Sequence, residues 1–283
     1  MKLLRIGPPG AETPVAATPD GEYHDLRSVA ADIDGAFLGS GGVGRARAAL
    51  AAGALPPFDV TGLRISPPLA RLGVVLCGGL NYAAHVAESG SPPPEHPVVF
   101  HKAPNTVVGP YDDLLLPHGS DRTDWEVELA VVIGRKACYP ESPEQSLACI
   151  GGYTVSNDVS EHRLQLETSG GQRSKGKSCE TFNPLGPWLL TPDEAPDAQA
   201  LGLRSWANGE PRQSSSASDM IFDVATLIHP LSRVRVLEPG GIVNTGTLEG
   251  VALPARFPHL TEGDLVEVEI DGLGRQTQKA VRA

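Results

Sequence analysis

Short apolar runs bounded by glycine, proline, asparagine or aspartate dominate the chain after residue 67. Their length and β-branched content predict strands at VVLCGGL, PVVFHK, VELAVVIG, IGGYTVSND, GPWLLT, LRSWANG, GGIVNTGT and DLVEVEIDG. Helical spacing occurs in fewer segments, namely NYAAHVAE, SPEQSLACI and FDVATLIHPLSRV. Because strands outnumber helices without regular β–α alternation, the pattern predicts a strand-dominated α+β body.

The first 67 residues have a different pattern. MKLLRIG and PVAATPDG are predicted to be strands around a turn, whereas HDLRSVAADI and RARAALAAGAL have helical spacing. The proline-rich stretch DVTGLRISPPLARLG then leads into the strand-rich part. We therefore expect a small N-terminal α+β domain at residues 1–67 and a larger domain at residues 68–283.

Residues 124–134 carry the strongest local signal. In a strand, alternate side chains point to opposite faces of the sheet. One face of this strand is wholly apolar, and the other passes from two glutamates to alanine and valine. The first face holds Trp125, Val127, Leu129, Val131 and Ile133, and the second holds Glu126, Glu128, Ala130 and Val132. The strand is therefore expected to be buried on both faces.

Glu126 and Glu128 lie side by side in that predicted strand. Two neighbouring carboxylates repel each other, and each is costly to remove from water. A bound cation relieves both costs, and ligands that are all carboxylates favour Mg²⁺, Mn²⁺ or Ca²⁺ over zinc. Asp158, at the end of GGYTVSND, is the candidate third ligand. The alternatives are a solvated strand end for the glutamates and a turn or helix cap for Asp158.

Three further residues complete the candidate chemistry. His85 and Glu88 are spaced i, i+3 and share one face of a helix. A carboxylate that holds an imidazole fixes its tautomer and raises its basicity, which suits the activation of water. Lys177 lies in the glycine-containing segment KGKS. The alternatives are an ordinary surface pair for His85 and Glu88 and a solvated side chain for Lys177.

Composition narrows the classes of partner and location. The chain has 23 Lys and Arg against 34 Asp and Glu, a net charge of −11, which argues against general binding to nucleic acid or anionic membranes. Its 4 cysteines form no C-x-x-C pair, so we expect reduced thiols in a cytoplasmic protein. No apolar run is long enough for a signal peptide or a membrane span, so neither is expected.

The segment from Gly39 to Gly44 fits the G-x-G-x-x-G pattern of dinucleotide-binding loops. Such a loop needs a buried strand before it and a long helix after it. The preceding ADIDGAFL is not a clean strand, and the following helix soon meets Pro56 and Pro57. We therefore interpret the segment as a loop at a helix start.

Several blocks occur in an order that resembles the fumarylacetoacetate hydrolase family. They are GGLNYAAHVAE, PVVFHKAPNTVVGP, DWEVELAVVIG, GGYTVSNDVS, KGKSCETFNPLGPWLLT, WANGEPRQSSSASDMIF and GGIVNTGTLEGV. The resemblance implies a catalytic domain of rolled, mixed β-sheets preceded by a small N-terminal domain. It also implies a homodimer that uses Mg²⁺ or a similar cation, Mn²⁺ or Ca²⁺ being the alternatives.

The resemblance also implies roles for individual residues. The metal ligands correspond to Glu126, Glu128 and Asp158, and the water-activating pair corresponds to His85 and Glu88. Lys177 corresponds to a catalytic lysine and is expected to stabilise the oxyanion formed at C4. Gln165 and Thr247 are implied to bind the substrate, and Arg163 is the further candidate for substrate binding. The family has an arginine four residues after the metal aspartate, but here His162 stands at that place and Arg163 follows it.

The branch that looks closest acts on 2,4-diketo-3-deoxy sugar acids. The implied activity is metal-dependent cleavage of a C–C bond in a 2,4-diketo acid, an acylpyruvate or a diketo-deoxy sugar acid, to pyruvate and a second acid. The alternative is decarboxylation of an oxaloacetate-type acid or isomerisation of a 2-hydroxyhepta-2,4-diene-1,7-dioate-type acid at the same metal site. The partner is then a small keto acid.

Overall fold

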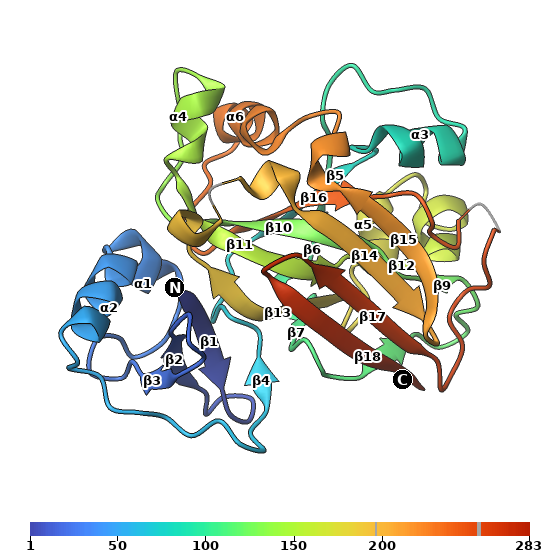
Figure 1. The fold of residues 1–283 in the computed structure, drawn as a ribbon. Helices are drawn as coiled ribbons and strands as arrows, with labels where there is room; N and C mark the ends of the chain where they lie inside the picture. The colour runs from blue at the N-terminus through green and yellow to red at the C-terminus, as the bar shows by residue number, and fades with distance from the viewer. Residues whose placement is uncertain (196, 254–255) are drawn as a thin grey trace.

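The computed structural model describes residues 1–195, 197–253 and 256–283. Its largest sheet has the strand order β3-β2-β1-β13-β11-β10-β16-β5-β6, with β4 added beside β1 and β7 beside β13 (Figure 1). The strands of this sheet are β1 (Lys2–Ile6), β2 (Thr13–Ala17), β3 (Tyr23–Asp25), β4 (Ile65–Ser66), β5 (Val75–Gly79), β6 (Val98–Lys102), β7 (Val107–Val108), β10 (Val127–Ile133), β11 (Ile150–Asn157), β13 (Asn183–Leu190) and β16 (Ile242–Thr247). Pairing is mixed, because β5 and β16 are parallel whereas β10 is antiparallel to both neighbours.

A second sheet packs over the middle of the first, in the strand order β15-β14-β17-β18-β8 (Figure 1). Its strands are β8 (Leu114–Leu116), β14 (Gly202–Ala207), β15 (Glu210–Ser216), β17 (Leu265–Ile270) and β18 (Gly274–Arg282). Two short strands, β9 (Thr123–Asp124) and β12 (Ser160–Glu161), pair with each other. The strand-dominated α+β fold predicted from the sequence is confirmed.

Strand β10 is buried on both faces, as its pattern predicted. Val127, Leu129 and Val131 belong to the core cluster that also contains Val266 and Val268 of β17. Ala130 and Val132 belong to a second cluster on the opposite face. The two glutamates at the start of β10 therefore continue a face whose other side chains are packed away from water.

Helices are short and lie at the edges of the sheets. They are α1 (Gly35–Gly39), α2 (Gly42–Ala51), α3 (Ala83–Ser89), α4 (Pro143–Leu147), α5 (Arg173–Lys177) and α6 (Val224–Val234), together with a π-helical turn η2 (Arg163–Glu167). Single 3₁₀ turns are η1 (Pro104–Thr106), η3 (Pro192–Glu194), η4 (Ala198–Ala200) and η5 (Ala217–Asp219). Within the described ranges, no helix has both the length and the hydropathy needed to cross a bilayer.

One predicted helix is wrong. The segment HDLRSVAADI finishes β3 and then forms turns. The Asp25 carboxylate accepts a hydrogen bond from the backbone N–H of Arg27 at 2.8 Å, and Asp32 accepts one from Ile33 at 2.8 Å. Such local bonds from aspartate compete with the helical hydrogen-bond pattern.

The N-terminal segment forms a lobe of its own that shares a sheet and a core with the body (Figure 1). Strand β1 pairs with β13 through Lys2 and Leu190 and through Leu3 and Leu189. Leu3 also lies in one apolar cluster with Leu185, Leu189 and Ile242. The division at residues 67 and 68 stays a prediction about chain organisation.

Because this core is shared, Leu3→Ala is expected to destabilise the lobe and the body together. Leu3 is fully buried, so the lost packing costs about 2–5 kcal/mol. Denaturant unfolding followed by both far-UV and tryptophan signals should show one transition at a lower midpoint. Leu63→Ala, at a side chain that is 45% exposed, is the control. Two separate transitions would contradict the shared core.

Candidate active site

The start of β10 and the end of β11 lie side by side, because the antiparallel register pairs Val127 with Asn157. Asp158 follows β11 directly, and its backbone N–H donates to the Glu126 carbonyl at 2.9 Å. Carboxylate oxygens of Glu126, Glu128 and Asp158 all lie within 4.8 Å of one another, and all three side chains are buried. The structure thus brings the three predicted metal ligands together.

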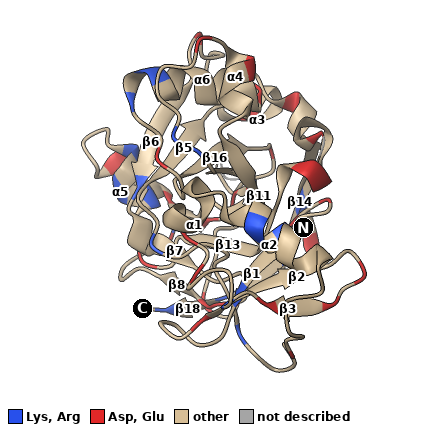
Figure 2. Ribbon diagram, turned by 90° about the vertical axis from the view of Figure 1, so that its left-hand side faces the viewer, with Lys and Arg blue, Asp and Glu red and all other residues tan. Residues whose placement is uncertain are grey.

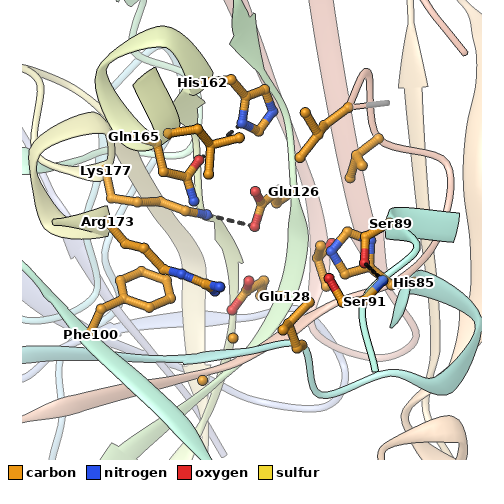
Figure 3. Close-up of a pocket in the computed structure, with 17 residues that line it drawn as sticks. His85, Ser89, Ser91, Phe100, Glu126, Glu128, His162, Gln165, Arg173 and Lys177 are labelled. Carbon is orange, nitrogen blue, oxygen red and sulfur yellow. Dashed lines mark hydrogen bonds and ion pairs between the residues drawn. The ribbon is translucent and has the colours of Figure 1, made fainter. Parts of the chain in front are cut away.

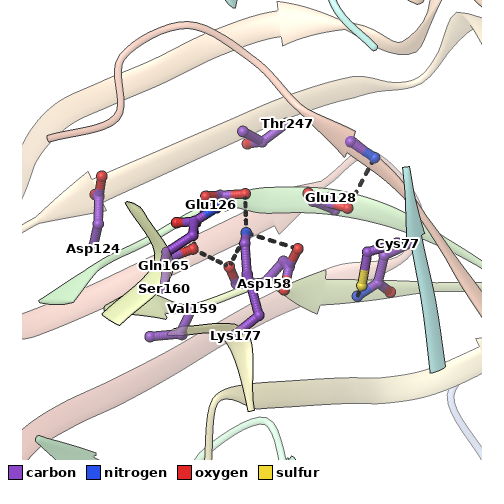
Figure 4. Close-up of polar contacts among 12 residues, drawn as sticks. Cys77, Asp124, Glu126, Glu128, Asp158, Val159, Ser160, Gln165, Lys177 and Thr247 are labelled. Atoms are coloured by element: carbon purple, nitrogen blue, oxygen red, sulfur yellow. Dashed lines mark hydrogen bonds and ion pairs between the residues drawn. The ribbon is translucent and has the colours of Figure 1, made fainter. Parts of the chain in front are cut away.

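Two buried lysines, Lys102 and Lys177, compensate part of this charge. Figure 4 shows Lys177 between Glu126 and Asp158. Lys177 Nζ lies 2.7 Å from Glu126 Oε2 and 2.9 Å from Asp158 Oδ2, and it also donates to the Asp158 carbonyl at 3.1 Å. Lys102 Nζ pairs with the other Asp158 oxygen. Burial raises the pKa of Asp158, but the charges of Lys102 and Lys177 outweigh it and hold that pKa below its ordinary value.

Lys177 is therefore buried, which excludes the alternative that it is a solvated lysine. Burial lowers its pKa, and the surrounding carboxylates outweigh this, so the net direction is upward. An ammonium has three N–H donors, and the described structure gives Lys177 three acceptors. It contributes positive charge to the site rather than a free hydrogen-bond donor.

Glu128 has no cationic partner among the described residues. Its carboxylate accepts a hydrogen bond from the backbone N–H of Gly246 at 2.9 Å. Burial raises its pKa well above the ordinary value, and the charges of Asp158 and Glu126 add to the rise. Three carboxylates beside two ammonium groups leave net negative charge in a buried place, which is costly without a further cation.

The donor set fits a hard divalent cation. All three candidate ligands are carboxylates, the type that Mg²⁺, Mn²⁺ and Ca²⁺ prefer. The existing hydrogen bonds do not exclude metal binding, because each carboxylate oxygen has two lone pairs. Ser160 donates to Glu126 Oε1 at 2.8 Å and so steadies that side chain.

A cavity of about 290 Å³ opens beside these carboxylates (Figure 3). This volume suits a small organic acid better than a nucleotide. Polar residues that line it include His85, Glu126, Glu128, His162, Gln165 and Arg173. Lys177 and Thr247 also line it, whereas Asp158 lies behind them in the protein interior.

His85 projects into the cavity from α3, on the side opposite Gln165 and Lys177 (Figure 3). Its Nδ1 lies 3.9 Å from Glu88 Oε2, an ion-pair distance that is too long for a hydrogen bond. Glu88 accepts from the backbone N–H of Gly250 at 2.9 Å and pairs with Arg256. The two residues share a helix face as predicted, and Glu88 also ties that helix to the loop after β16.

Arg163 does not reach the cavity. Its guanidinium pairs with Asp121 at the surface. Arg173 lines the cavity instead (Figure 3). It lies on the basic helix α5, which packs beside β6 (Figure 2). A Cβ placed at Gly79 would approach Arg173 Nη1 to 2.9 Å, so glycine leaves room for the guanidinium there. Within residues 1–195, 197–253 and 256–283, the Arg173 side chain has no hydrogen-bond or ion-pair partner.

Thr247 lies at the predicted place but its hydroxyl is already bonded. It donates to the Val127 carbonyl at 3.0 Å and accepts from Gln213 Nε2 at 2.8 Å. Gln213 in turn accepts from the Val127 backbone N–H at 3.1 Å. Thr247 therefore holds the start of β10 in place.

Sequence reasoning missed Lys102, Asp124 and Arg173. Strand alternation in VVFHK places Lys102 on the same buried face as Phe100, which was the available signal for the lysine. Asp124 lies at the beginning of the segment 124–134, ahead of the two glutamates. Only the tertiary structure shows that it faces His162. Nothing in the loop sequence around Arg173 indicates a cavity position.

The glycine-rich segment Gly39–Gly44 joins α1 to α2, as the loop interpretation predicted. A helix rather than a buried strand precedes it. It therefore lacks the strand–turn–helix context of a dinucleotide site.

Comparison with known proteins gives the family. Residues 74–281 match the fumarylacetoacetate (FAA) hydrolase C-terminal family. The chain belongs to the fumarylacetoacetate hydrolase family. A relative from Burkholderia multivorans, provisionally named a hydrolase with no substrate specified, is 45% identical over 281 residues and covers 98% of each chain.

Solved structures in this family include both hydrolases and isomerases. A 5-carboxymethyl-2-hydroxymuconate delta-isomerase from Mycobacterium smegmatis is 31% identical, with a TM-score of 0.79 over 100% of this chain and 99% of that one. A maleylpyruvate hydrolase from Sphingobium sp. SYK-6, in complex with manganese and pyruvate, is 26% identical, with a TM-score of 0.81 over 100% of both chains. The chain is therefore an enzyme of the fumarylacetoacetate hydrolase family.

Glu126→Gln is expected to abolish tight metal binding while the protein stays folded. The change removes one anionic ligand and leaves Lys177 its bonds to Asp158. Loss of outer residues around a metal typically costs 10–100-fold in affinity, so loss of a ligand should cost at least about 100-fold. Mn²⁺ titration followed by electron paramagnetic resonance measures this. Glu141→Gln, at the surface, is the matched control. Unchanged Mn²⁺ affinity in Glu126→Gln would overturn the ligand assignment.

Proposed function

We propose that this protein is a divalent-metal-dependent hydrolase that cleaves the C3–C4 bond of a 2,4-diketo acid, an acylpyruvate or a diketo-deoxy sugar acid. The observation that carries the proposal is the cavity itself. Two members of the buried carboxylate triad, Glu126 and Glu128, line this cavity of about 290 Å³ together with His85 on the facing wall. Arg173, which has no ion-pair partner among the described residues, lines it as well. These are the parts needed to hold a keto acid and to add water to it.

The reaction balances with water as the only co-reactant. Water oxygen bonds to C4 of R–CO–CH₂–CO–COO⁻, and the C3–C4 bond breaks with its electron pair going to C3. C3 then takes a proton, so the products are R–COO⁻, pyruvate and one proton. The difficult charge is the pyruvate enolate. Held by Glu126, Glu128 and Asp158, Mg²⁺, Mn²⁺ or Ca²⁺ would supply Lewis acidity that offsets this charge.

His85 is the proposed base for the water. It lies across the cavity from the carboxylates, and its Nδ1 makes no hydrogen bond to a described protein group. Glu88 Oε2 lies 3.9 Å from this Nδ1 and places a carboxylate beside the ring. Lys177 supports the developing negative charge through its own charge, because its N–H groups are engaged.

Arg173 is the proposed holder of a substrate carboxylate. An unpaired guanidinium in a cavity is a fork of donors that matches a carboxylate. It also attracts an anionic substrate toward a site that contains Glu126 and Glu128. Arg163, which the sequence analysis predicted to bind the substrate, forms an ion pair with Asp121 instead. The homodimer expected from the resemblance stays a prediction.

Isomerisation is the second candidate, favoured by the 31% identity with an isomerase over nearly the whole chain. The same triad would stabilise an enolate in that reaction, so fold and ligands do not separate the two. Decarboxylation of an oxaloacetate-type acid uses the same charge stabilisation. Hydrolysis is preferred because His85 lines the cavity on the wall opposite the carboxylates, where a base for the attacking water is needed.

Metal-stripped protein supplied with Mg²⁺ or Mn²⁺ is expected to convert acetylpyruvate to pyruvate and acetate. Loss of the enol absorbance gives the rate, and reaction in ¹⁸O-labelled water should place one label in acetate. Oxaloacetate and a 2-hydroxy-dienedioate, tested in parallel, serve as comparisons. Carbon dioxide release from oxaloacetate alone, or a mass-preserving conversion of the dienedioate alone, would replace hydrolysis with the corresponding alternative.

Arg173→Met and Arg163→Met separate the two arginines. Removing a charged hydrogen bond costs about 1.5–3 kcal/mol, so Arg173→Met should raise KM for the keto acid roughly 10–100-fold. Arg163→Met removes only a surface ion pair, so its KM should stay within about twofold. Steady-state kinetics of both variants decides the matter. A larger effect at Arg163 than at Arg173 would reverse the assignment.

A further inference from the structure

A buried chain of side chains leads from Asp124 through His162 to Gln165, and the metal chemistry does not use it. His162 Nε2 lies 2.8 Å from Asp124 Oδ2, and His162 Nδ1 lies 3.0 Å from Gln165 Oε1. Asp124 is fully buried and His162 is 2% exposed. His162 and Gln165 both line the cavity.

Asp124 is fixed before it reaches His162. Its Oδ1 accepts from the Trp125 backbone N–H at 2.8 Å, and its Oδ2 accepts from the Leu253 backbone N–H at 3.1 Å. The His162 backbone N–H donates to the Arg122 carbonyl at 3.1 Å. The ring of His259 packs edge-on to His162, with the centroids 5.9 Å apart. The His162 ring therefore has one orientation.

That orientation decides which end of the Gln165 amide faces the cavity. In the structure both ring nitrogens of His162 face oxygen atoms, Asp124 Oδ2 and Gln165 Oε1, and an imidazole protonated on both nitrogens donates to each of them. Burial lowers the pKa of His162, but the hydrogen bond and charge of Asp124 raise it above the ordinary value, in agreement with two donors. The NH₂ group of Gln165 then remains for another partner.

Within the described residues, Gln165 Nε2 donates no hydrogen bond, and Figure 3 shows it on the side where Lys177 and Glu126 lie. Its backbone is part of the π-helical turn η2, an irregular geometry that often occurs at functional sites. The three N–H groups of Lys177 are already bonded. The NH₂ group of Gln165 is therefore a neutral donor that a substrate oxygen could use there.

We infer that Asp124 and His162 are positioning residues that hold Gln165 with its NH₂ group toward the substrate, as the hydrogen-bond donor to the oxygen on C4. The inference rests on the proposed function for the identity of that oxygen. The resemblance already implied that Gln165 faces the substrate, and the new element is that Asp124 and His162 set which end of its amide does so. A donor at this place strengthens its bond as the C4 carbonyl becomes an oxyanion. The site would accordingly favour substrates with a carbonyl or carboxylate oxygen at this place.

The first test is kinetic. Gln165→Met keeps the Asp124–His162 pair and removes the donor, so kcat for acetylpyruvate should fall about 100-fold with a smaller change in KM. His162→Asn should produce a fall of similar size, because it frees the Gln165 amide. The double variant should be no slower than the slower single variant, since both act through one hydrogen bond. Glu167→Gln, on the same turn and paired with Arg122 at the surface, is the control.

The second test needs no turnover. In ¹⁵N-labelled, Mg²⁺-loaded protein, Gln165→Met identifies the side-chain NH₂ signal of Gln165, and oxalate is the probe. Oxalate should shift this signal in the wild type and leave it at the free-amide position in His162→Asn. The long-range imidazole spectrum should show His162 with both nitrogens protonated.

The outcomes separate the two proposals. An oxalate-shifted Gln165 signal together with an inert acetylpyruvate would keep the positioning chain and overturn the proposed hydrolysis. A Gln165 signal that responds to oxalate equally in wild type and His162→Asn would overturn the positioning chain. So would rate losses that multiply in the double variant, because independent structural damage would then explain them.

Discussion

The structure depends on the burial of three carboxylates beside two ammonium groups. Glu126, Glu128 and Asp158 lie at the meeting point of β10 and β11, where water is excluded. Lys102 and Lys177 neutralise Asp158 and Glu126 but leave Glu128 with a backbone donor alone. An uncompensated buried charge is expensive, so the surrounding fold is built to keep these groups in place and to accept a cation.

The remaining features of the site follow from holding this charge. Thr247 and Gln213 brace the start of β10, and Ser160 steadies Glu126. The second sheet covers the apolar face of β10, so the glutamates cannot turn toward solvent on that side. The open face carries the cavity, where His85 and Arg173 lie within reach of a small acid. Glu126 and Glu128 thus form a fixed wall of the cavity, and the substrate is expected to bind against that wall.

Family membership and the reaction are separate conclusions. Hydrolases and isomerases share this fold, so the carboxylate triad by itself indicates stabilisation of an enolate and no more. What distinguishes the reactions is whether water is placed against a carbonyl carbon. His85 on one wall and the Gln165 amide on the other are the groups that bear on this choice in the present chain.

The sequence by itself determined the strands, the double burial of β10 and the acidic triad. Alternation of side chains is a local property. Burying carboxylates in an apolar strand costs so much free energy that their presence indicates a bound cation. Local pattern failed at HDLRSVAADI, where the Asp25 and Asp32 carboxylates accept hydrogen bonds from the backbone N–H groups of Arg27 and Ile33. Only the tertiary structure decided that Arg173 rather than Arg163 faces the cavity, that Lys102 joins Asp158 and that Asp124 holds His162. These contacts join residues from different loops and strands, and where a loop directs a side chain depends on the packing of the whole chain.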